Sequence, residues 1–136
     1  MIKKFYIESI FLVLLGALTS LSLPPFNYLI INFLTLSLFY VFLVNKFNLK
    51  KNKKFFFLYG WFFGFGYFVS NLYWVSISLT FDESLKFLIP FTIILIPTFL
   101  SLFYALVTFF FAVLKPKKNI SSFFLFSVIF AIIEFI

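Results

Sequence analysis

Five long apolar runs, separated by short breaks that carry nearly all of the charge, constrain this chain more than any other feature. A helix needs about 20 apolar residues to cross the hydrocarbon core of a bilayer, and every run but the last is long enough. We therefore expect an all-α fold, a polytopic transmembrane bundle of about five helices in a single domain over residues 1–136. The expected spans are residues 5–23, 26–44, 55–79, 87–114 and 120–136.

The composition requires lipid as the solvent. Hydrophobic residues make up 64% of the 136 residues, whereas a soluble domain of this size would leave roughly a third of its surface exposed to water. The 27 phenylalanines, beside eleven lysines and no arginine, are typical of an AT-rich genome, so we attach no functional weight to the phenylalanine content itself.

Several kinds of site are excluded because the residue types they need are missing. The chain has no cysteine and no histidine, so it offers no thiol nucleophile and no imidazole base or metal ligand. It also lacks a pair of carboxylates and a glycine-rich phosphate loop. The net charge of +7 does not predict nucleic-acid binding, because the lysines lie only between apolar runs. We expect no catalytic residue, cofactor, metal or nucleic acid on this chain.

The positions of the lysines predict how the chain is oriented in the membrane. Basic residues in short loops are retained in the cytoplasm. If the N-terminus is cytoplasmic, ten of the eleven lysines fall on that side, and only Lys86 lies outside, beside Asp82 and Glu83. The ten are Lys3, Lys4, Lys46, Lys50, Lys51, Lys53, Lys54, Lys115, Lys117 and Lys118.

The two ends of the chain each allow a further interpretation. "KK" followed by an apolar run and "GALTS" has the order of a cleaved signal peptide, but the run is longer than a usual signal core and leads directly into another span. The fifth run is short of a full span and is still apolar at Ile136. We therefore expect these residues to be part of a longer, truncated protein.

The third run carries the most informative pattern. On a helix, six of its residues share one narrow stripe: Gly60, Gly64, Tyr67, Asn71, Trp74 and Ser78. Gly60 and Gly64 let another helix approach closely, and Asn71 needs a hydrogen-bond partner that lipid cannot supply. The stripe is predicted to face protein. We favour ordinary helix packing, with Tyr73 and Trp74 in an interfacial belt, over direct contact with a substrate.

The fourth run repeats this pattern, and Glu134 in the fifth is the residue most open to a functional interpretation. The polar stripe of the fourth run contains Pro97, Ser101, Tyr104 and Thr108. Pro90 and Pro97 each remove a backbone N–H and are expected to bend the helix. An ionisable Glu134 either faces protein or water, or marks the membrane boundary. Glu8 is expected to reach the headgroups as an interfacial charge.

The order of these features resembles the N-terminal membrane domain of bacterial apolipoprotein N-acyltransferases. The resemblance lies in "GALTSLSLPPFNYLIINFLTLSLFYVFL", where a helix with small residues runs into Pro24, Pro25 and Phe26, and in "GWFFGFGYFVSNLYWVSISL". "FLSLFYAL" and the closing "AIIEF" follow in the expected order, so the resemblance covers nearly the whole chain. The family typically continues after "EF" with an Arg-Gly pair, which this sequence does not reach.

The resemblance implies a multi-pass protein of the bacterial inner membrane, joined to a nitrilase-like domain on the periplasmic side. In that domain a Glu, a Lys and a Cys move an acyl chain from a membrane phospholipid to the N-terminal diacylglyceryl-cysteine of an apolipoprotein. None of these three residues is carried over, because the family places them beyond Ile136. This chain would then be the scaffold, inactive by itself, with Tyr73, Trp74 and Glu134 near the surface where the catalytic domain docks.

Two other classes of function are compatible with a helical membrane domain. A small transporter could use the kinked fourth run and the polar stripes as a path, but the sequence shows neither an internal repeat nor a charge at mid-depth. A non-enzymatic assembly subunit could use its small-residue faces to bind partner helices.

Overall fold

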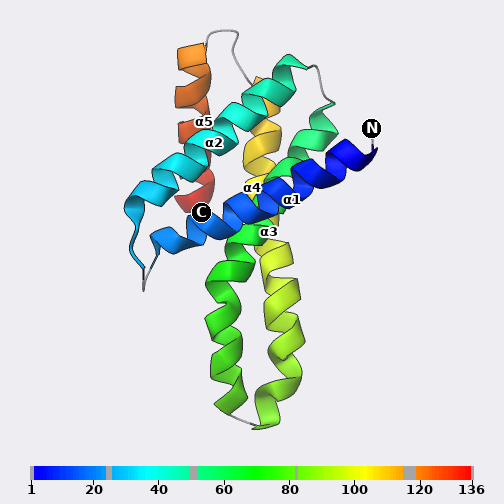
Figure 1. Cartoon of the computed structure of the whole chain (residues 1–136), viewed down its shortest axis with the longest axis vertical. Coiled ribbons are helices and arrows are strands. Elements are labelled where there is room, and N and C mark those ends of the chain that lie inside the picture. Colours follow the sequence, from blue (N-terminus) through cyan, green and yellow to red (C-terminus); the bar gives the residue numbers. More distant parts are fainter. Residues whose placement is uncertain (1, 24–25, 50–51, 82, 115–118, 136) are drawn as a thin grey trace.

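The computed structural model describes residues 2–23, 26–49, 52–81, 83–114 and 119–135, which form helices joined by short turns (Figure 1). These residues contain no strand, and four of their helical segments are long and apolar enough to cross a membrane. The predicted all-helical fold is thereby confirmed. The five α-helices are α1 (Ile2–Thr19), α2 (Leu29–Asn48), α3 (Lys53–Ser78), α4 (Ile96–Leu114) and α5 (Asn119–Phe135).

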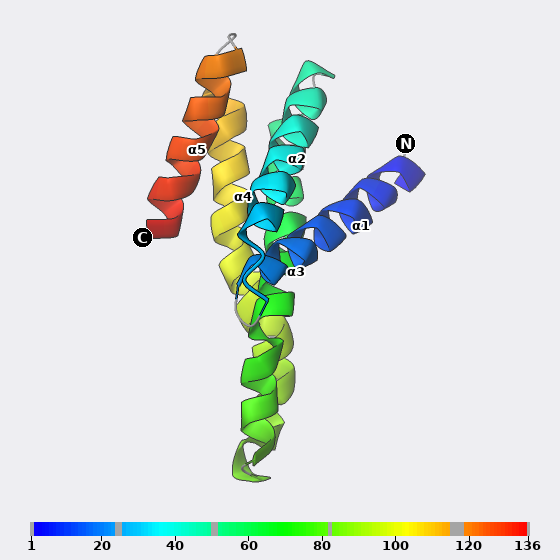
Figure 2. The same cartoon turned by 60° about the vertical axis from the view of Figure 1, so that its left-hand side comes forward.

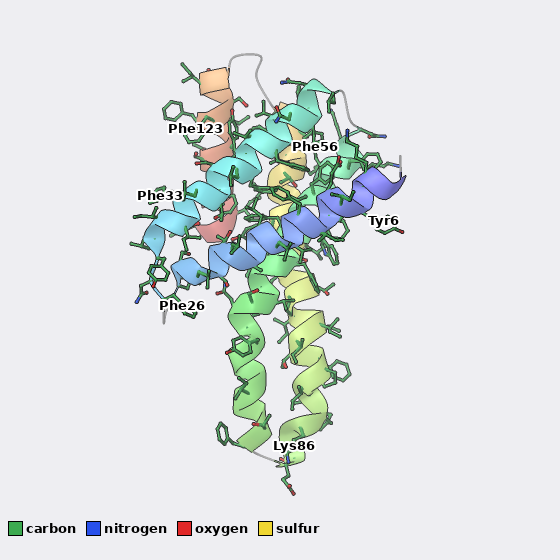
Figure 3. The ribbon with its side chains drawn as sticks, viewed as in Figure 1. Tyr6, Phe26, Phe33, Phe56, Lys86 and Phe123 are labelled. Atoms are coloured by element: carbon green, nitrogen blue, oxygen red, sulfur yellow. The ribbon has the colours of Figure 1, made fainter. Side chains whose placement is uncertain are left out.

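The antiparallel helices α3 and α4 form the centre of the bundle, and the other helices pack around one half of this pair (Figures 1 and 2). Helix α1 crosses α3, and α5 lies beside α4. After α1 the chain reverses direction, so that α2 returns toward the end of the bundle where α3 begins. The end of the bundle where α2 ends, α3 begins, α4 ends and α5 begins is called the lysine-rich end below. The other half of the α3–α4 hairpin extends beyond α1, α2 and α5, and Lys86 lies at its tip (Figure 3).

The starts of two helices differ from the expected spans for local reasons. Helix α2 begins at Leu29 because Asn27 has a positive φ of 55°, which ends the turn that precedes the helix. Helix α4 begins only at Ile96, after the 3-10 segment η3 (Glu83–Leu88) and a π-helical turn, η4 (Phe91–Leu95). Pro97 has no N–H for the carbonyl four residues earlier, and a widened turn accommodates its ring.

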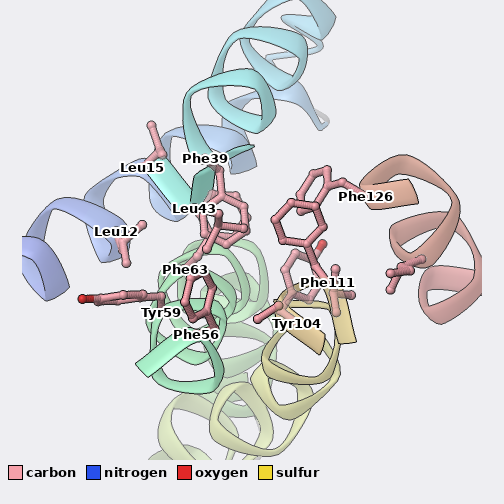
Figure 4. Packing of buried hydrophobic residues seen from close by; sticks show 13 residues of the cluster. Leu12, Leu15, Phe39, Leu43, Phe56, Tyr59, Phe63, Tyr104, Phe111 and Phe126 are labelled. Carbon is pink, nitrogen blue, oxygen red and sulfur yellow. The ribbon is translucent and has the colours of Figure 1, made fainter. Parts of the chain in front are cut away.

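The core is built mainly from aromatic rings (Figure 4). Phe39 of α2 stacks on Phe63 of α3 with ring centroids 4.1 Å apart, and Phe126 of α5 contacts Phe39 edge-on at 6.2 Å. Phe111 of α4 contacts the same Phe126 ring at 5.5 Å. Single rings therefore join α2, α3, α4 and α5, which gives phenylalanine a packing role at these positions.

Helix α1 crosses α3 at a contact between backbones. A Cβ added to Gly66 would overlap the carbonyl oxygen of Val13, and one added to Gly16 would overlap that of Phe63. Two glycines, one on each helix, therefore set how closely α1 approaches α3. Helix α2 is joined to α1 by a buried hydrogen bond of 2.9 Å from Thr19 Oγ1 to Thr35 Oγ1.

Candidate functional site

The α3–α4 contact is formed by the small residues of the two predicted stripes. A Cβ on Gly60 would overlap the Thr108 hydroxyl and the Tyr104 carbonyl oxygen of α4. One on Gly64 would lie 2.9 Å from Tyr104 Cβ and 3.1 Å from Ser101 Cα. Gly60 and Gly64 thus lie directly against the polar stripe of α4, and the two stripes meet each other.

Hydroxyl groups along this contact bond to backbone carbonyls. Thr108, which is fully buried, donates from Oγ1 to the Phe56 carbonyl of α3 at 2.7 Å. Ser101, also fully buried, donates to the Thr98 carbonyl of its own helix at 2.7 Å. Lipid offers no hydrogen-bond partner, so these bonds satisfy groups that would otherwise be costly to bury.

Further along the same pair of helices lies a cavity of about 490 Å³, called the lateral crevice below. The ring of Tyr104 contacts three of the other lining rings, with centroids 5.7 Å from Tyr67, 5.4 Å from Phe68 and 5.0 Å from Phe130. Phe99 at the rim is 60% exposed, so the crevice opens on the side of the bundle. Its lining comes from α3 (Tyr67, Phe68), α4 (Phe99, Leu100, Phe103, Tyr104, Val107) and α5 (Phe130, Ile133).

The depth of the crevice follows from helix geometry. Tyr67 lies fourteen residues after Lys53, the first residue of α3, which corresponds to about 21 Å along the helix axis. The hydrocarbon core of a bilayer is about 30 Å thick. Val107 at the other end of the lining lies seven residues before Leu114, the last residue of α4, which corresponds to about 10 Å. The crevice therefore spans the midplane and extends into the half of the bilayer away from the lysine-rich end.

The other residues singled out from the sequence are not brought into one site. Phe26 is 55% exposed in the turn before α2, and its ring stacks on Tyr28 at 6.4 Å. Asn71 is half-buried, whereas Tyr73 is 59% exposed and points away from the core. Pro24 and Pro25 lie outside the described residues, and so do the side chains of Trp74, Ser78 and Glu134.

A buried ionic cluster near the lysine-rich end has no counterpart in the sequence analysis. Glu8 of α1 pairs with Lys46 of α2 at 2.5 Å and accepts a 2.8 Å hydrogen bond from the Tyr59 hydroxyl of α3. Glu8 and Lys46 are 9% and 7% exposed, and Tyr59 is fully buried. The Lys46 ammonium also lies 4.9 Å from the centre of the Phe42 ring.

This cluster corrects the interpretation of two charges. The expectation that Glu8 is an interfacial charge that reaches the headgroups is wrong, because its carboxylate is enclosed by three helices. Lys46 is not in a loop, because α2 continues to Asn48, past the expected end at residue 44. The available signal was the position of Lys46 directly after "VFLVN", inside apolar sequence.

The chemistry that this arrangement supports is binding of an apolar group. Within the part of the chain that the structure describes, no three His, Cys, Asp or Glu residues gather to hold a metal ion. The lateral crevice is lined almost entirely by aromatic and aliphatic side chains, with tyrosines as its polar residues. Such a crevice, open on the side of a membrane bundle, suits a hydrocarbon chain that enters from the bilayer.

Comparison with known proteins identifies relatives over most of the chain. The family model "Apolipoprotein N-acyltransferase N-terminal domain" matches residues 15–136. The apolipoprotein N-acyltransferase of Rhizobium rhizogenes is 34% identical over 99 residues, which cover 68% of this chain and 18% of the relative. That of Rhodopseudomonas palustris is 36% identical over 102 residues, covering 73% and 19%, and that of Brucella suis 47% over 47 residues, covering 34% and 9%.

The chain spans at most about a fifth of the length of these curated relatives. No solved structure matches it.

Proposed function

The chain belongs to the family of apolipoprotein N-acyltransferase N-terminal domains, and from this premise we propose that it is the membrane domain of such an acyltransferase. The proposed reaction of the whole enzyme moves an acyl chain from a phospholipid to the N-terminal diacylglyceryl-cysteine of a bacterial lipoprotein. The chain contributes the scaffold rather than the reacting groups, since it carries no cysteine and no histidine. Its proposed location is the bacterial inner membrane.

The observation that carries this proposal is the position and lining of the lateral crevice. Both proposed substrates are lipids of the outer leaflet, so an acyl chain must reach the enzyme sideways through the bilayer. With the N-terminus in the cytoplasm, the crevice extends from the middle of the membrane into its outer half, where Tyr67 lies about 21 Å from the lysine-rich end. We propose that it holds part of an acyl chain, while the tip of the α3–α4 hairpin lies on the periplasmic side, toward the catalytic domain.

The crevice can be tested with a phospholipid that carries a photoreactive group in its acyl chain. In proteoliposomes of this chain, we expect cross-links on the peptide that contains Phe99 and on the peptide that contains Phe130, since both rings line the crevice. With a diacylglyceryl-cysteine peptide added, mass spectrometry should detect no N-acylated product, because the reacting groups lie outside this chain. Formation of that product would contradict the scaffold role.

A matched pair of variants separates the crevice from general contact with lipid. Leu100→Trp replaces an aliphatic side chain of the crevice lining with a bulkier indole ring and should lower cross-linking at Phe130. Leu102→Trp makes the same change at a position that is 39% exposed and does not line the crevice, and should leave it unchanged. Cross-linking at Phe33, which is 76% exposed on α2, serves as the internal reference. Equal effects of both variants would contradict binding in the crevice.

The proposed orientation predicts which loops are open to the periplasm. Because the chain has no cysteine, a single introduced thiol can be labelled without background. Ser84→Cys in η3 should react with a membrane-impermeant maleimide on intact spheroplasts, whereas Asn52→Cys before α3 should react only after permeabilisation. Both positions are exposed, so accessibility differs only through the membrane. The opposite labelling pattern would overturn the proposed topology and the leaflet assigned to the crevice.

A further inference from the structure

A second hollow lies on the α3–α4 hairpin, closer to the lysine-rich end than the lateral crevice. We call it the basal groove; its volume is about 540 Å³. Leu58 and Leu106 in its lining are 39% and 38% exposed, so the groove opens outward. Its lining residues do not belong to the buried core cluster. They are Lys54, Phe57 and Leu58 of α3 and Leu106 and Phe109 of α4.

The groove follows from the close approach of the two helices. Gly60 lies three residues after Phe57 and meets Ala105, four residues before Phe109, where an added Cβ would lie 2.9 Å from the Ala105 Cα. Backbones that approach this closely leave the larger side chains on either side to form walls. Phe57 and Phe109 are two such side chains, one from each helix.

The charge at this end of the groove is unbalanced. The described residues form two ion pairs, Lys46 with Glu8 and Lys86 with Glu83, and neither of them involves Lys54. Lys54 is exposed and lines the groove, and its neighbour Lys53 is also exposed. The chain's other acidic residues, Asp82 and Glu134, lie in the sequence near the opposite helix ends. The apolar groove thus has at one end a cation, Lys54, that has no carboxylate partner among the described residues.

We propose that the basal groove binds an anionic phospholipid of the leaflet at the lysine-rich end. The Lys54 ammonium would contact the phosphate, and the first part of one acyl chain would lie between the walls formed by Phe57 and Phe109. Basic pockets between membrane helices select lipids with a net negative headgroup, because a zwitterionic headgroup brings its own cation. This inference does not rest on the proposed acyltransferase function, which concerns the other leaflet.

Trp61 provides a local probe, because it lies one helical turn after Phe57 on the same side of α3. The chain has two tryptophans, so Trp74→Phe leaves Trp61 as the only one. In vesicles that mix phosphatidylglycerol and phosphatidylcholine, either lipid can carry brominated acyl chains that quench tryptophan fluorescence. We expect brominated phosphatidylglycerol to quench Trp61 with an apparent affinity about fivefold higher than that of brominated phosphatidylcholine, as for one lysine contact near an anionic surface.

The variants then identify the cation. Lys54→Gln should abolish the fivefold preference, so that the two brominated lipids quench with about the same apparent affinity. Lys54→Arg should retain the preference, since only the charge is required. Lys86→Gln, at the opposite tip of the hairpin, should leave it unchanged. Equal quenching by the two lipids in the parent chain, or a preference that survives Lys54→Gln, would overturn the proposal. Quenching by neither lipid would also overturn it, because a protein segment would then cover the groove.

Discussion

Glu8→Ala is expected to lower the free energy of unfolding of this chain by about 3–5 kcal/mol, the largest effect of any single substitution considered. The variant removes the carboxylate that neutralises Lys46 and accepts a hydrogen bond from the Tyr59 hydroxyl. Both partners then stay buried among α1, α2 and α3 without this acceptor. Equilibrium unfolding in mixed micelles, followed by circular dichroism, measures the change.

Two controls show whether the loss comes from the stranded charge. Glu83→Ala breaks the other ion pair, whose carboxylate side chain is 94% exposed, and should change stability little because water replaces the lost contact. Glu8→Gln combined with Lys46→Met removes both charges and should recover most of the stability lost in Glu8→Ala, since no uncompensated charge remains. If Glu8→Ala and Glu83→Ala have the same effect, the buried pair does not stabilise the bundle.

The helices themselves could be predicted because membrane insertion is decided by local sequence. Each apolar run of about 20 residues, and the lysines in the break beside it, can be recognised without knowledge of the other helices. The same holds for Pro97, because its missing N–H is a property of one residue; in the structure Pro97 directly follows the widened turn of η4 and Ile96. The exact starts depended on single backbone angles, such as the positive φ of Asn27, which the sequence does not specify.

The stripe of small and polar residues on α3 indicated a protein-facing surface but not its partner. Spacing places Gly60 and Gly64 on one side of a helix whatever lies opposite. That the opposite surface is the Ser101–Thr108 side of α4 depends on the hairpin connection and on the angle between the two helices. The functional interpretation of Tyr73 gained no support from packing, because its ring points outward.

The ionic cluster and the two hollows could not be read from spacing, since each is built by several helices. Glu8 and Tyr59 are 51 residues apart, and only the crossing of α1 over α3 brings them together. The lateral crevice needs Phe130 of α5 beside Tyr104 of α4. A charged residue inside apolar sequence, as at Lys46, is a local signal of such a cluster, but it does not name the partner.

Gly66→Ala is expected to destabilise the bundle by about 1–3 kcal/mol, as for overpacking of a tight contact, even though alanine favours the helix. The new Cβ would overlap the Val13 carbonyl oxygen, and a backbone group cannot rotate away as a side chain can. Gly64→Ala should cost less, because its nearest neighbours are the Tyr104 Cβ and Ser101 atoms at 2.9–3.2 Å. The same micellar unfolding measurement gives both values.

Combining substitutions tests the crossing itself, because Gly16 and Gly66 limit the same approach of α1 to α3. Once one alanine has displaced α1, the second has less contact left to disturb. The double variant Gly16→Ala with Gly66→Ala should therefore lose clearly less stability than the sum of the single losses. Gly64→Ala with Gly66→Ala disturbs two different partners, α4 and α1, and its losses should add within about 0.5 kcal/mol. Additive losses for the first pair would show that the two glycines do not share one contact, and α1 would then be held on α3 by the Glu8 cluster and its aromatic neighbours instead.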